Sequence, residues 1–393
     1  MRWRNYRIYL AGQTVSLIGT FMQMVGISWL VYRLTQSEIA LGFYSFLTEL
    51  SSVAVVLFAG VLADRNNPKN ILLSTNILAM LLACALSALV FTGRIDIVSV
   101  FAFGCLLGLV NGFDAPARHA LLPNMVEERS DLRNAIALYS LALDAARLVG
   151  PALAGMVIAS WGEGMCFLAN GVSYLVVIIS LLSLRLMPRQ CITVHEDMVR
   201  SLSEGIRYVC GHRSIRAVIL LVVCMSFGGS PVAVLMPVMA AGVLKGGPQT
   251  LGILLASTSL GALAGAFFLG MKRGTDGLRQ TMGVGACLYG LGTAAFSLST
   301  WLTLSAALLA LAGFGVMIMM ASGNTILLLE VEADKRGRVM SLFTLSCMGT
   351  VPFGSLCAGI LAKFMGSQAT IALGAGVCIF GALLFILYTS KRL

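Results

Sequence analysis

The sequence predicts an all-α membrane protein with twelve transmembrane helices arranged as two pseudo-symmetric six-helix bundles. Composition, a series of apolar runs and an internal repeat lead to this prediction. The 393 residues are 58% hydrophobic and only 11% charged, and their mean hydropathy is +0.90. A soluble domain carries about 25% charged residues. The chain is therefore expected to lie in a lipid bilayer.

Twelve apolar runs are each long enough to cross a hydrocarbon core of about 30 Å. In chain order they lie near 8–32, 40–63, 71–92, 97–117, 134–159, 165–187, 215–241, 250–271, 280–299, 301–326, 339–364 and 368–389. The first run is too long for a signal peptide, and no small-residue cleavage site follows it. Nothing outside the runs is large enough for a soluble catalytic domain, so we do not expect an enzyme.

The distribution of basic residues predicts the orientation in the membrane. If both termini are cytoplasmic, 22 of the 27 Lys and Arg residues fall in cytoplasmic segments. This asymmetry follows the positive-inside rule. The net charge of +10 then indicates cytoplasmic faces against anionic lipid, and we expect no nucleic-acid partner.

The runs divide into an N-terminal bundle, residues 1–187, and a C-terminal bundle, residues 215–393, joined by a cytoplasmic linker, residues 188–214. Within the linker, residues 196–210 are expected to form an amphipathic surface helix. Glycines recur at constant offsets of 204 and 210 residues: Gly150, Gly155 and Gly162 as Gly354, Gly359 and Gly366, and Gly42 and Gly60 as Gly252 and Gly270. The offsets align the fifth run with the eleventh and the second with the eighth, as expected for parallel repeats around a pseudo-two-fold axis.

The turn between the second and third runs, residues 60–69, reads GVLADRNNPK. Gly60 lets a neighbouring backbone approach closely, while Asp64 and Arg65 put opposite charges at the membrane surface. This turn resembles the signature loop of the major facilitator superfamily of secondary transporters. It departs from the family pattern at position 67, where the family has Gly, and at position 68, where it has a base. Because Asn67 tolerates the left-handed conformation of a Gly, we expect the turn to be retained.

The resemblance also implies a gate, because in the superfamily the Asp of this loop bonds to the fourth and eleventh helices and closes the cytoplasmic side. The implied gate residues are Gly60, Asp64, Arg65, Lys69, Arg118, Arg336 and Arg338. Arg118 lies at the foot of the fourth run, and the pair Arg336 and Arg338 precedes the eleventh. A solvated charged rim is the alternative role.

The fifth run contains a second motif, formed by Gly150, Pro151 and Gly155. The proline removes a backbone donor, and the glycines allow close packing. The motif resembles the Gly-Pro motif of facilitator antiporters, which is associated with export; a generic packing kink is the alternative. Together with shorter motifs over residues 108–155 and in the first run, it resembles the enterobactin-exporter-like branch, which contains siderophore exporters and macrolide efflux pumps. This resemblance implies a multi-pass protein of the bacterial inner membrane.

Ionisable groups inside a membrane are costly, so each one is a functional hypothesis. Glu49, Asp144 and Arg147 lie within the apolar runs. Glu49 lies roughly 13 Å below the outer surface and has no oppositely charged residue one helical turn away. We interpret it as a candidate proton carrier, with a neutral, packed carboxyl as the alternative. Asp144 is the second proton-coupling candidate.

Arg147 is the charged candidate for substrate binding. It lies three residues after Asp144, so the two can pair on one helix face, and the acid would be released when substrate binds. A purely structural pair is the alternative. Asp144→Asn is expected to leave a buried unpaired cation and to impair folding. The other binding candidates are the amide side chains Gln13, Gln23, Asn111, Asn170 and Asn324, for each of which a helix–helix hydrogen bond is the alternative.

The sequence contains no signal for a cofactor. Its cysteines mostly lie singly in apolar runs, and neither a CxxC pair nor a His/Cys cluster has metal-ligand spacing. We expect no metal and no other cofactor. The expected partners are a small-molecule substrate, protons and the lipid bilayer, with the chain acting as a monomer.

These observations favour a secondary active transporter, a proton-coupled exporter of a siderophore or a similar mid-sized amphiphilic molecule. A multidrug or macrolide efflux pump and a siderophore uptake permease are the alternatives within this class. A non-transporting membrane receptor or assembly partner is the alternative from a different class. ATP-driven transport is disfavoured, because the chain has no GxxxxGK[ST] loop.

Overall fold

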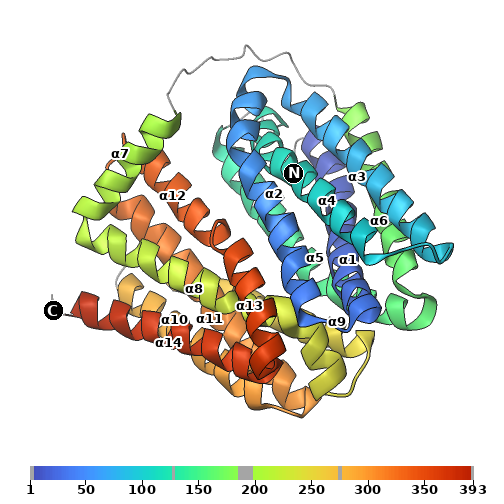
Figure 1. The fold of residues 1–393 in the computed structure, drawn as a ribbon. Helices are drawn as coiled ribbons and strands as arrows, with labels where there is room; N and C mark the ends of the chain where they lie inside the picture. The colour runs from blue at the N-terminus through green and yellow to red at the C-terminus, as the bar shows by residue number, and fades with distance from the viewer. Residues whose placement is uncertain (1–3, 126–128, 185–197, 273–276, 391–393) are drawn as a thin grey trace. The chain divides into compact units, whose positions relative to one another are not determined.

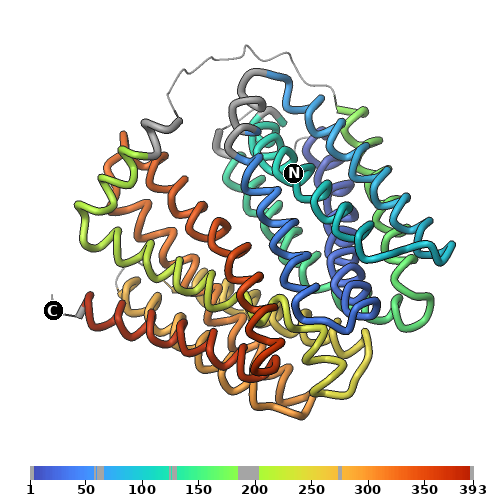
Figure 2. The backbone as a smooth tube through the Cα atoms, viewed as in Figure 1, coloured from blue at the N-terminus to red at the C-terminus, as the bar shows by residue number. Residues whose placement is uncertain are grey.

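The computed structural model describes residues 4–125, 129–184, 198–272 and 277–390 (Figures 1 and 2). Within its helices, side chains are not described at 57–58, 60–65, 124, 129–130, 198–202 and 390. The described residues form helices and short connections, and no strand occurs among them. Twelve helices are long and apolar enough to cross a membrane, which confirms the predicted fold class.

The first half of the chain supplies six of these helices. They are α1 (Arg4–Thr35), α2 (Glu38–Arg65), α3 (Pro68–Phe91), α4 (Ile97–Leu121), α5 (Arg129–Trp161) and α6 (Glu163–Ser183). A 3₁₀ turn, Leu122–Met125, follows α4. The connections between these helices are short, and local capping and turn residues end or begin several helices. The Asp96 carboxylate accepts from the Ser99 backbone N–H at 3.3 Å to cap α4, and Gly162, with φ of 79°, reverses the chain before α6.

The second half supplies the other six spans. Its helices are α8 (Arg213–Val238), α9 (Pro248–Met271), α10 (Leu278–Leu298), α11 (Leu302–Glu330), α12 (Arg336–Met348), α13 (Val351–Met365) and α14 (Ser367–Ser390). A π-helical segment, Met239–Val243, extends α8. The expected amphipathic helix over 196–210 corresponds to α7 (Met198–Gly211).

The eleventh apolar run differs from the prediction, because it is broken into α12 and α13 (Figure 1). Thr350 lies between the two helices, and Pro352 occupies the first turn of α13. A proline has no backbone N–H to donate to the preceding turn and crowds the residue before it. Because the run is apolar along its length, its composition did not predict this interruption.

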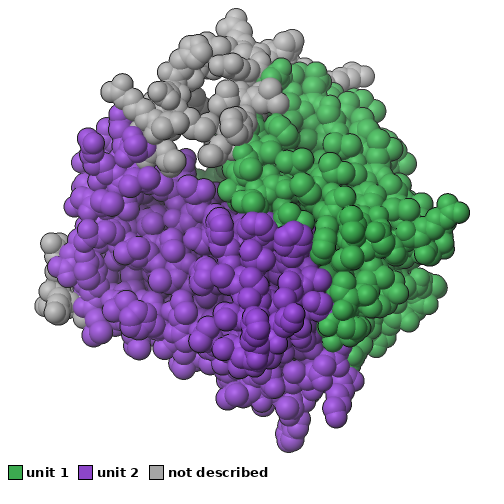
Figure 3. All heavy atoms as spheres, viewed as in Figure 1, with its two compact units in different colours: residues 1–36, 47–194, 246–256 green, residues 37–46, 195–245, 257–393 purple. Residues whose placement is uncertain are grey.

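The described contacts divide the chain into two compact units (Figure 3). Unit 1 comprises residues 1–36, 47–194 and 246–256, and unit 2 comprises residues 37–46, 195–245 and 257–393. The units therefore follow the two halves of the sequence, except that each includes the start of one helix from the other half. The start of α2 belongs to unit 2, and the start of α9 belongs to unit 1.

Each unit has its own interior. In unit 1, α1 packs on α5 and α6, and α3 packs on α4 and α6. The core at one end of this unit includes Tyr6, Tyr9, Leu121 and Leu181. In unit 2, α10 packs on α11 and α14, and α8 packs on α13 and α14. The amphipathic helix α7 packs on α12 and contributes Val209 to the unit 2 core.

Candidate functional site

Glu49 lies on the face of α2 that also carries Gly42 and Phe46. These three positions follow the i, i+4, i+7 spacing of one helix face. Phe46 contacts Phe353 of α13 edge to face, with ring centroids 6.1 Å apart. The Glu49 side chain is partly buried and has no hydrogen-bond or ion-pair partner among the described residues. It is therefore an uncompensated carboxyl in the middle of a membrane span.

Asp144 and Arg147 pair on α5, as their spacing predicted. Arg147 Nη1 lies 3.9 Å from Asp144 Oδ1, and the Arg147 guanidinium lies 5.7 Å from the ring centroid of Phe21 on α1. The arginine side chain is 49% exposed. Asp144→Asn would therefore not leave a fully buried cation, and our reason for expecting it to impair folding does not hold. The guanidinium is half exposed and also contacts Asp144 and Phe21.

The five amide candidates fall into two groups. Asn170 donates to Gln23 at 2.8 Å, and both side chains are buried between α6 and α1. Gln13 is also buried, with 4% exposure. By contrast, Asn111 is exposed and Asn324 is partly buried. Only the second group presents an amide at a surface, while the Gln23–Asn170 pair is engaged in helix packing.

Part of the signature loop is not described, because the structure gives only the helical backbone at Gly60, Asp64 and Arg65. Asn67 does not adopt the left-handed conformation that we expected. Its φ of −69° and ψ of 114° are extended, and its side chain accepts from the Lys69 backbone N–H at 3.0 Å. Asn67 thus caps α3, a role that favours Asn. The Lys69 ammonium donates to the carbonyl of Leu184 at 2.8 Å, beyond the end of α6.

Arg118 belongs to a buried polar cluster in unit 1. It forms an ion pair with Asp114 one turn earlier in α4, and its Nη1 donates to the hydroxyl of Tyr139 on α5 at 2.7 Å. Asp114 also accepts from Thr75 at 3.1 Å and from Asn76 at 3.2 Å, both on α3. The cluster therefore joins α3, α4 and α5 through one carboxylate and one guanidinium.

Sequence reasoning missed the burial of Asp114, which is 7% exposed although it lies near the end of its run. Its signal was the i, i+4 spacing to Arg118, because a buried acid needs a neighbouring base. Two nearby atoms, the hydroxyl of Tyr9 and Nε of Arg118, are buried without a hydrogen-bond partner among the described residues.

The two arginines implied at the eleventh helix occupy different environments. Arg336, at the start of α12, is exposed. Arg338 Nη1 lies 2.8 Å from Glu204 of α7. A Cβ placed on Gly205 would lie 3.1 Å from a methyl of Leu342, so α7 packs closely on α12 around this ion pair. Arg338 therefore connects the amphipathic helix to the start of the eleventh span.

The Gly-Pro motif lies within a continuous helix, since α5 runs without interruption through Pro151. Its glycines contact two different helices. A Cβ on Gly150 would lie 2.6 Å from Cβ of Phe21 on α1, whereas a Cβ on Gly155 would lie 3.0 Å from Cα of Gln249 at the start of α9. The absence of a side chain at both glycines thus lets α5 approach α1 and α9 closely.

Within the residues that the structure describes, no three His, Cys, Asp or Glu side chains are placed to hold a metal ion. The candidate charged groups instead lie at three separate positions in membrane spans. These are Glu49 on α2, the Asp144–Arg147 pair on α5, and the cluster around Asp114 and Arg118. Such an arrangement can carry protons and bind a charged solute.

Comparisons with known proteins identify the family of the chain. A family model described as transmembrane secretion effector matches residues 1–392. The chain is similar to the staphyloferrin A transporter of Staphylococcus aureus, with 21% identity covering 93% of this chain and 92% of that protein. It is similar to the multidrug efflux pump Tap of Mycolicibacterium fortuitum, with 24% identity covering 95% and 93%.

The enterobactin exporter EntS of Escherichia coli is 23% identical over 395 residues, which cover 98% of this chain and 92% of the exporter. Among solved structures, a POT family transporter in complex with a thioalcohol conjugated peptide superposes with a TM-score of 0.76. That match covers 99% of this chain and 96% of the other at 13% identity, and it shows a shared fold.

Proposed function

Because this chain belongs to the transmembrane secretion effector family of the major facilitator superfamily, we propose that it is a proton-coupled exporter of a siderophore or a similar mid-sized amphiphilic molecule. Its broader class is a multi-pass bacterial membrane transporter and not an enzyme. We further propose that it acts as a monomer in the inner membrane with both termini cytoplasmic. The distribution of Lys and Arg supports this orientation.

The observation that carries the proton-coupling proposal is the environment of Glu49. A carboxylate without a charged partner inside a membrane span is costly, and it persists where it has a function. The repeat equivalent of Glu49 in α9, at an offset of 210 residues, is Ser259. The acid at position 49 is therefore not repeated in the C-terminal half.

Arg147 supports an anionic substrate. Its guanidinium is half exposed, lies 3.9 Å from Asp144 and is positioned over the Phe21 ring. Such a site offers a positive charge and an aromatic face together, which suits a carboxylate or catecholate group. Its repeat equivalent in α13 is Val351, so this charge too is specific to the N-terminal half. Two relatives named for siderophores are consistent with this substrate class.

Drug efflux is the second candidate. The similarity to the multidrug efflux pump Tap spans nearly the whole chain, and a macrolide efflux protein of Streptococcus pyogenes matches 66% of it. The fold is shared by both candidates, so the distinction lies in the substrate. A neutral or cationic macrolide would not need Arg147.

The proposal is tested in vesicles that contain the purified full-length chain and a pH-sensitive dye. Enterobactin, staphyloferrin A and a macrolide are added separately, and proton movement is recorded for wild type and Glu49→Gln. A siderophore should produce a proton signal in wild type that is lost in the variant. Counterflow exchange should persist, because Gln keeps the hydrogen-bonding capacity of the protonated acid but cannot release a proton.

Glu38→Gln is the matched control, because it removes a carboxyl from the first turn of the same helix and should retain the proton signal. Equal signals in wild type and Glu49→Gln would remove Glu49 from coupling and shift the role to Asp144. Proton-coupled movement of the macrolide alone would replace siderophore export by drug efflux.

A further inference from the structure

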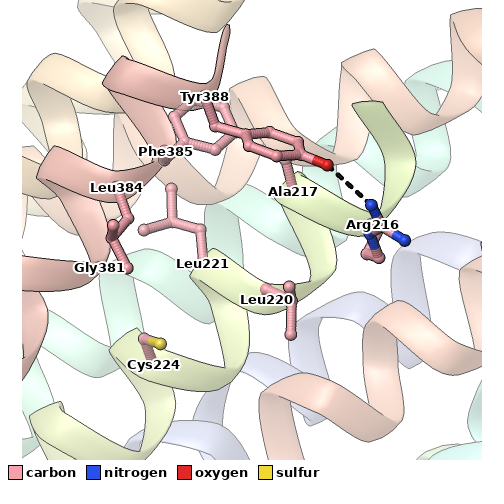
Figure 4. Close-up of a pocket in the computed structure, with 9 residues that line it drawn as sticks. All are labelled: Arg216, Ala217, Leu220, Leu221, Cys224, Gly381, Leu384, Phe385 and Tyr388. Atoms are coloured by element: carbon pink, nitrogen blue, oxygen red, sulfur yellow. Dashed lines mark hydrogen bonds between the residues drawn. The ribbon is translucent and has the colours of Figure 1, made fainter. Parts of the chain in front are cut away.

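Helices α8 and α14 of unit 2 border a groove of about 300 Å³ (Figure 4). Its walls are largely apolar and include Leu220 and Leu221 of α8 and Leu384 of α14. Figure 4 shows the two helices contributing side chains from opposite sides of the groove. Leu220 is 55% exposed and Leu384 is 49% exposed, although both belong to membrane spans. The groove therefore opens on the surface of these helices.

One end of the groove is polar and positively charged. Arg216 donates to the hydroxyl of Tyr388 at 2.7 Å (Figure 4), and the guanidinium of Arg213 lies 4.0 Å from the centroid of the same ring. Neither arginine has a carboxylate within ion-pair distance among the described residues. Among the residues that the structure describes, no acidic side chain therefore compensates their two charges.

A second, smaller recess adjoins the groove at Tyr388. It is lined by Arg213, Ser214, Arg279 and Thr389 as well as by the tyrosine. Arg279 is already paired with Glu330 at 2.7 Å, so the positive charge of this end comes from Arg213 and Arg216. The apolar groove and the basic recess are neighbours that share Tyr388 as a lining residue.

The position of this feature along the helices matches a membrane surface. α8 begins at Arg213 and α14 ends at Ser390, so the basic end lies where both spans leave the hydrocarbon. Long basic side chains at such positions extend their charges to the headgroup level. On the orientation supported by the Lys and Arg distribution, this surface is the cytoplasmic one.

We propose that this groove binds one anionic phospholipid of the cytoplasmic leaflet. The lipid phosphate lies at Arg213 and Arg216, and one acyl chain lies along Leu220 and Leu384. Basic pockets between membrane helices bind anionic head groups, and the planar guanidinium matches a phosphate in geometry and charge. A phosphatidylcholine with the same chains binds less tightly, because its choline places a cation beside two arginines.

The groove volume also fits this occupant. Pockets that bind small molecules measure about 300–1,000 Å³, so the groove is large enough for part of one acyl chain. The assignment is independent of the transported substrate, since it uses none of the residues proposed for coupling or substrate binding.

The test uses the purified full-length chain in detergent and native mass spectrometry, with dioleoyl phosphatidylglycerol compared with dioleoyl phosphatidylcholine. We expect phosphatidylglycerol to bind at one saturable site, and Arg213→Ala with Arg216→Ala to lower its affinity by ~10-fold. Arg207→Ala is the charge-matched control, because Arg207 is exposed on α7 and lies outside the groove. It should leave the affinity unchanged.

Cys224 provides a second readout, because it lines the groove. Phosphatidylglycerol should slow its alkylation by N-ethylmaleimide at least several-fold, while the exposed Cys84 and Cys357 react at unchanged rates. Inorganic phosphate has no acyl chain and should not protect Cys224. This measurement needs no variant, so it holds even if the loss of Arg216 impairs folding.

Three results would overturn the proposal. They are equal binding of the two lipids, an equal loss of affinity in Arg207→Ala, and protection of Cys224 by inorganic phosphate alone. The last would indicate a phosphate site in place of a lipid site.

Discussion

Gly155 of α5 and Gly252 of α9 pack back to back. A Cβ on Gly155 would lie 3.3 Å from Cα of Gly252, and a Cβ on Gly252 would lie 3.1 Å from Cα of Gly155. The same relationship joins Gly42 of α2 and Gly359 of α13, at 2.9 Å and 3.0 Å. Four of the glycines that recur in the sequence, one pair at each offset of 204 and 210 residues, are therefore partners in two equivalent contacts.

The backbone around these contacts repeats as well. The carbonyl of Pro151 lies 2.5 Å from the Cβ position of Gly252, and its counterpart 204 residues later, Ser355, lies 2.6 Å from that of Gly42. The repeat inferred from glycines alone is thus a structural repeat. It also explains the composition of the units, because each contact brings the start of α2 or α9 to a helix of the other half.

Gly252→Val should destabilise the protein by ~1–3 kcal/mol, the usual cost of overpacking a close contact. Gly42→Val should have a similar effect, because the two sites are equivalent. Thermal unfolding of the purified variants in detergent measures both. Gly376→Ala is the control, since a Cβ there would meet nothing within 4 Å, and wild-type stability of Gly252→Val would show that the contact is loose.

Asp114→Asn should cost ~3–5 kcal/mol, because it removes the carboxylate partner of a largely buried arginine. The side chain of Arg118 is 20% exposed and that of Asp114 is 10% exposed. Asp334→Asn breaks an exposed pair with Lys335 and should cost less than ~1 kcal/mol. Unfolding curves of the two variants that coincide would contradict a structural role of the Asp114 cluster. The double variant Asp114→Leu with Arg118→Met should recover part of the loss.

Arg147→Gln should reduce transport of an anionic siderophore by at least ~10-fold, equivalent to about 1.4 kcal/mol, and leave macrolide transport nearly unchanged. The guanidinium is half exposed, so the protein should remain folded. Uptake and efflux assays with both substrates in vesicles measure the difference. Equal losses for the two substrates would assign Arg147 to helix packing instead.

Asp64→Asn should abolish most transport while the protein remains folded and inserted, as the resemblance of residues 60–69 to the facilitator signature loop implies. Glu332→Gln is the control, because it removes an exposed acid near the start of α12 without touching that loop. Initial transport rates at matched expression are compared. Normal transport by Asp64→Asn would show that the loop has lost its gating role in this chain.

The sequence by itself determined the twelve spans, because a bilayer requires about 20 consecutive apolar residues wherever a helix crosses it. It also determined relationships within one helix. Asp144 and Arg147 pair as their spacing predicted, because the α-helical period places residues three apart on one face. The internal repeat was readable for the same reason, since close helix contacts require small residues at fixed positions.

Only the tertiary structure decided which side chains meet across helices. Lipid tails are as apolar as leucine, so the sequence of a membrane helix does not distinguish the face that packs on protein from the face that meets lipid. The bond between Gln23 and Asn170, the burial of Asp114 against α3, and the groove between α8 and α14 all depend on that distinction. These contacts join residues far apart in the chain, where no local period can relate them.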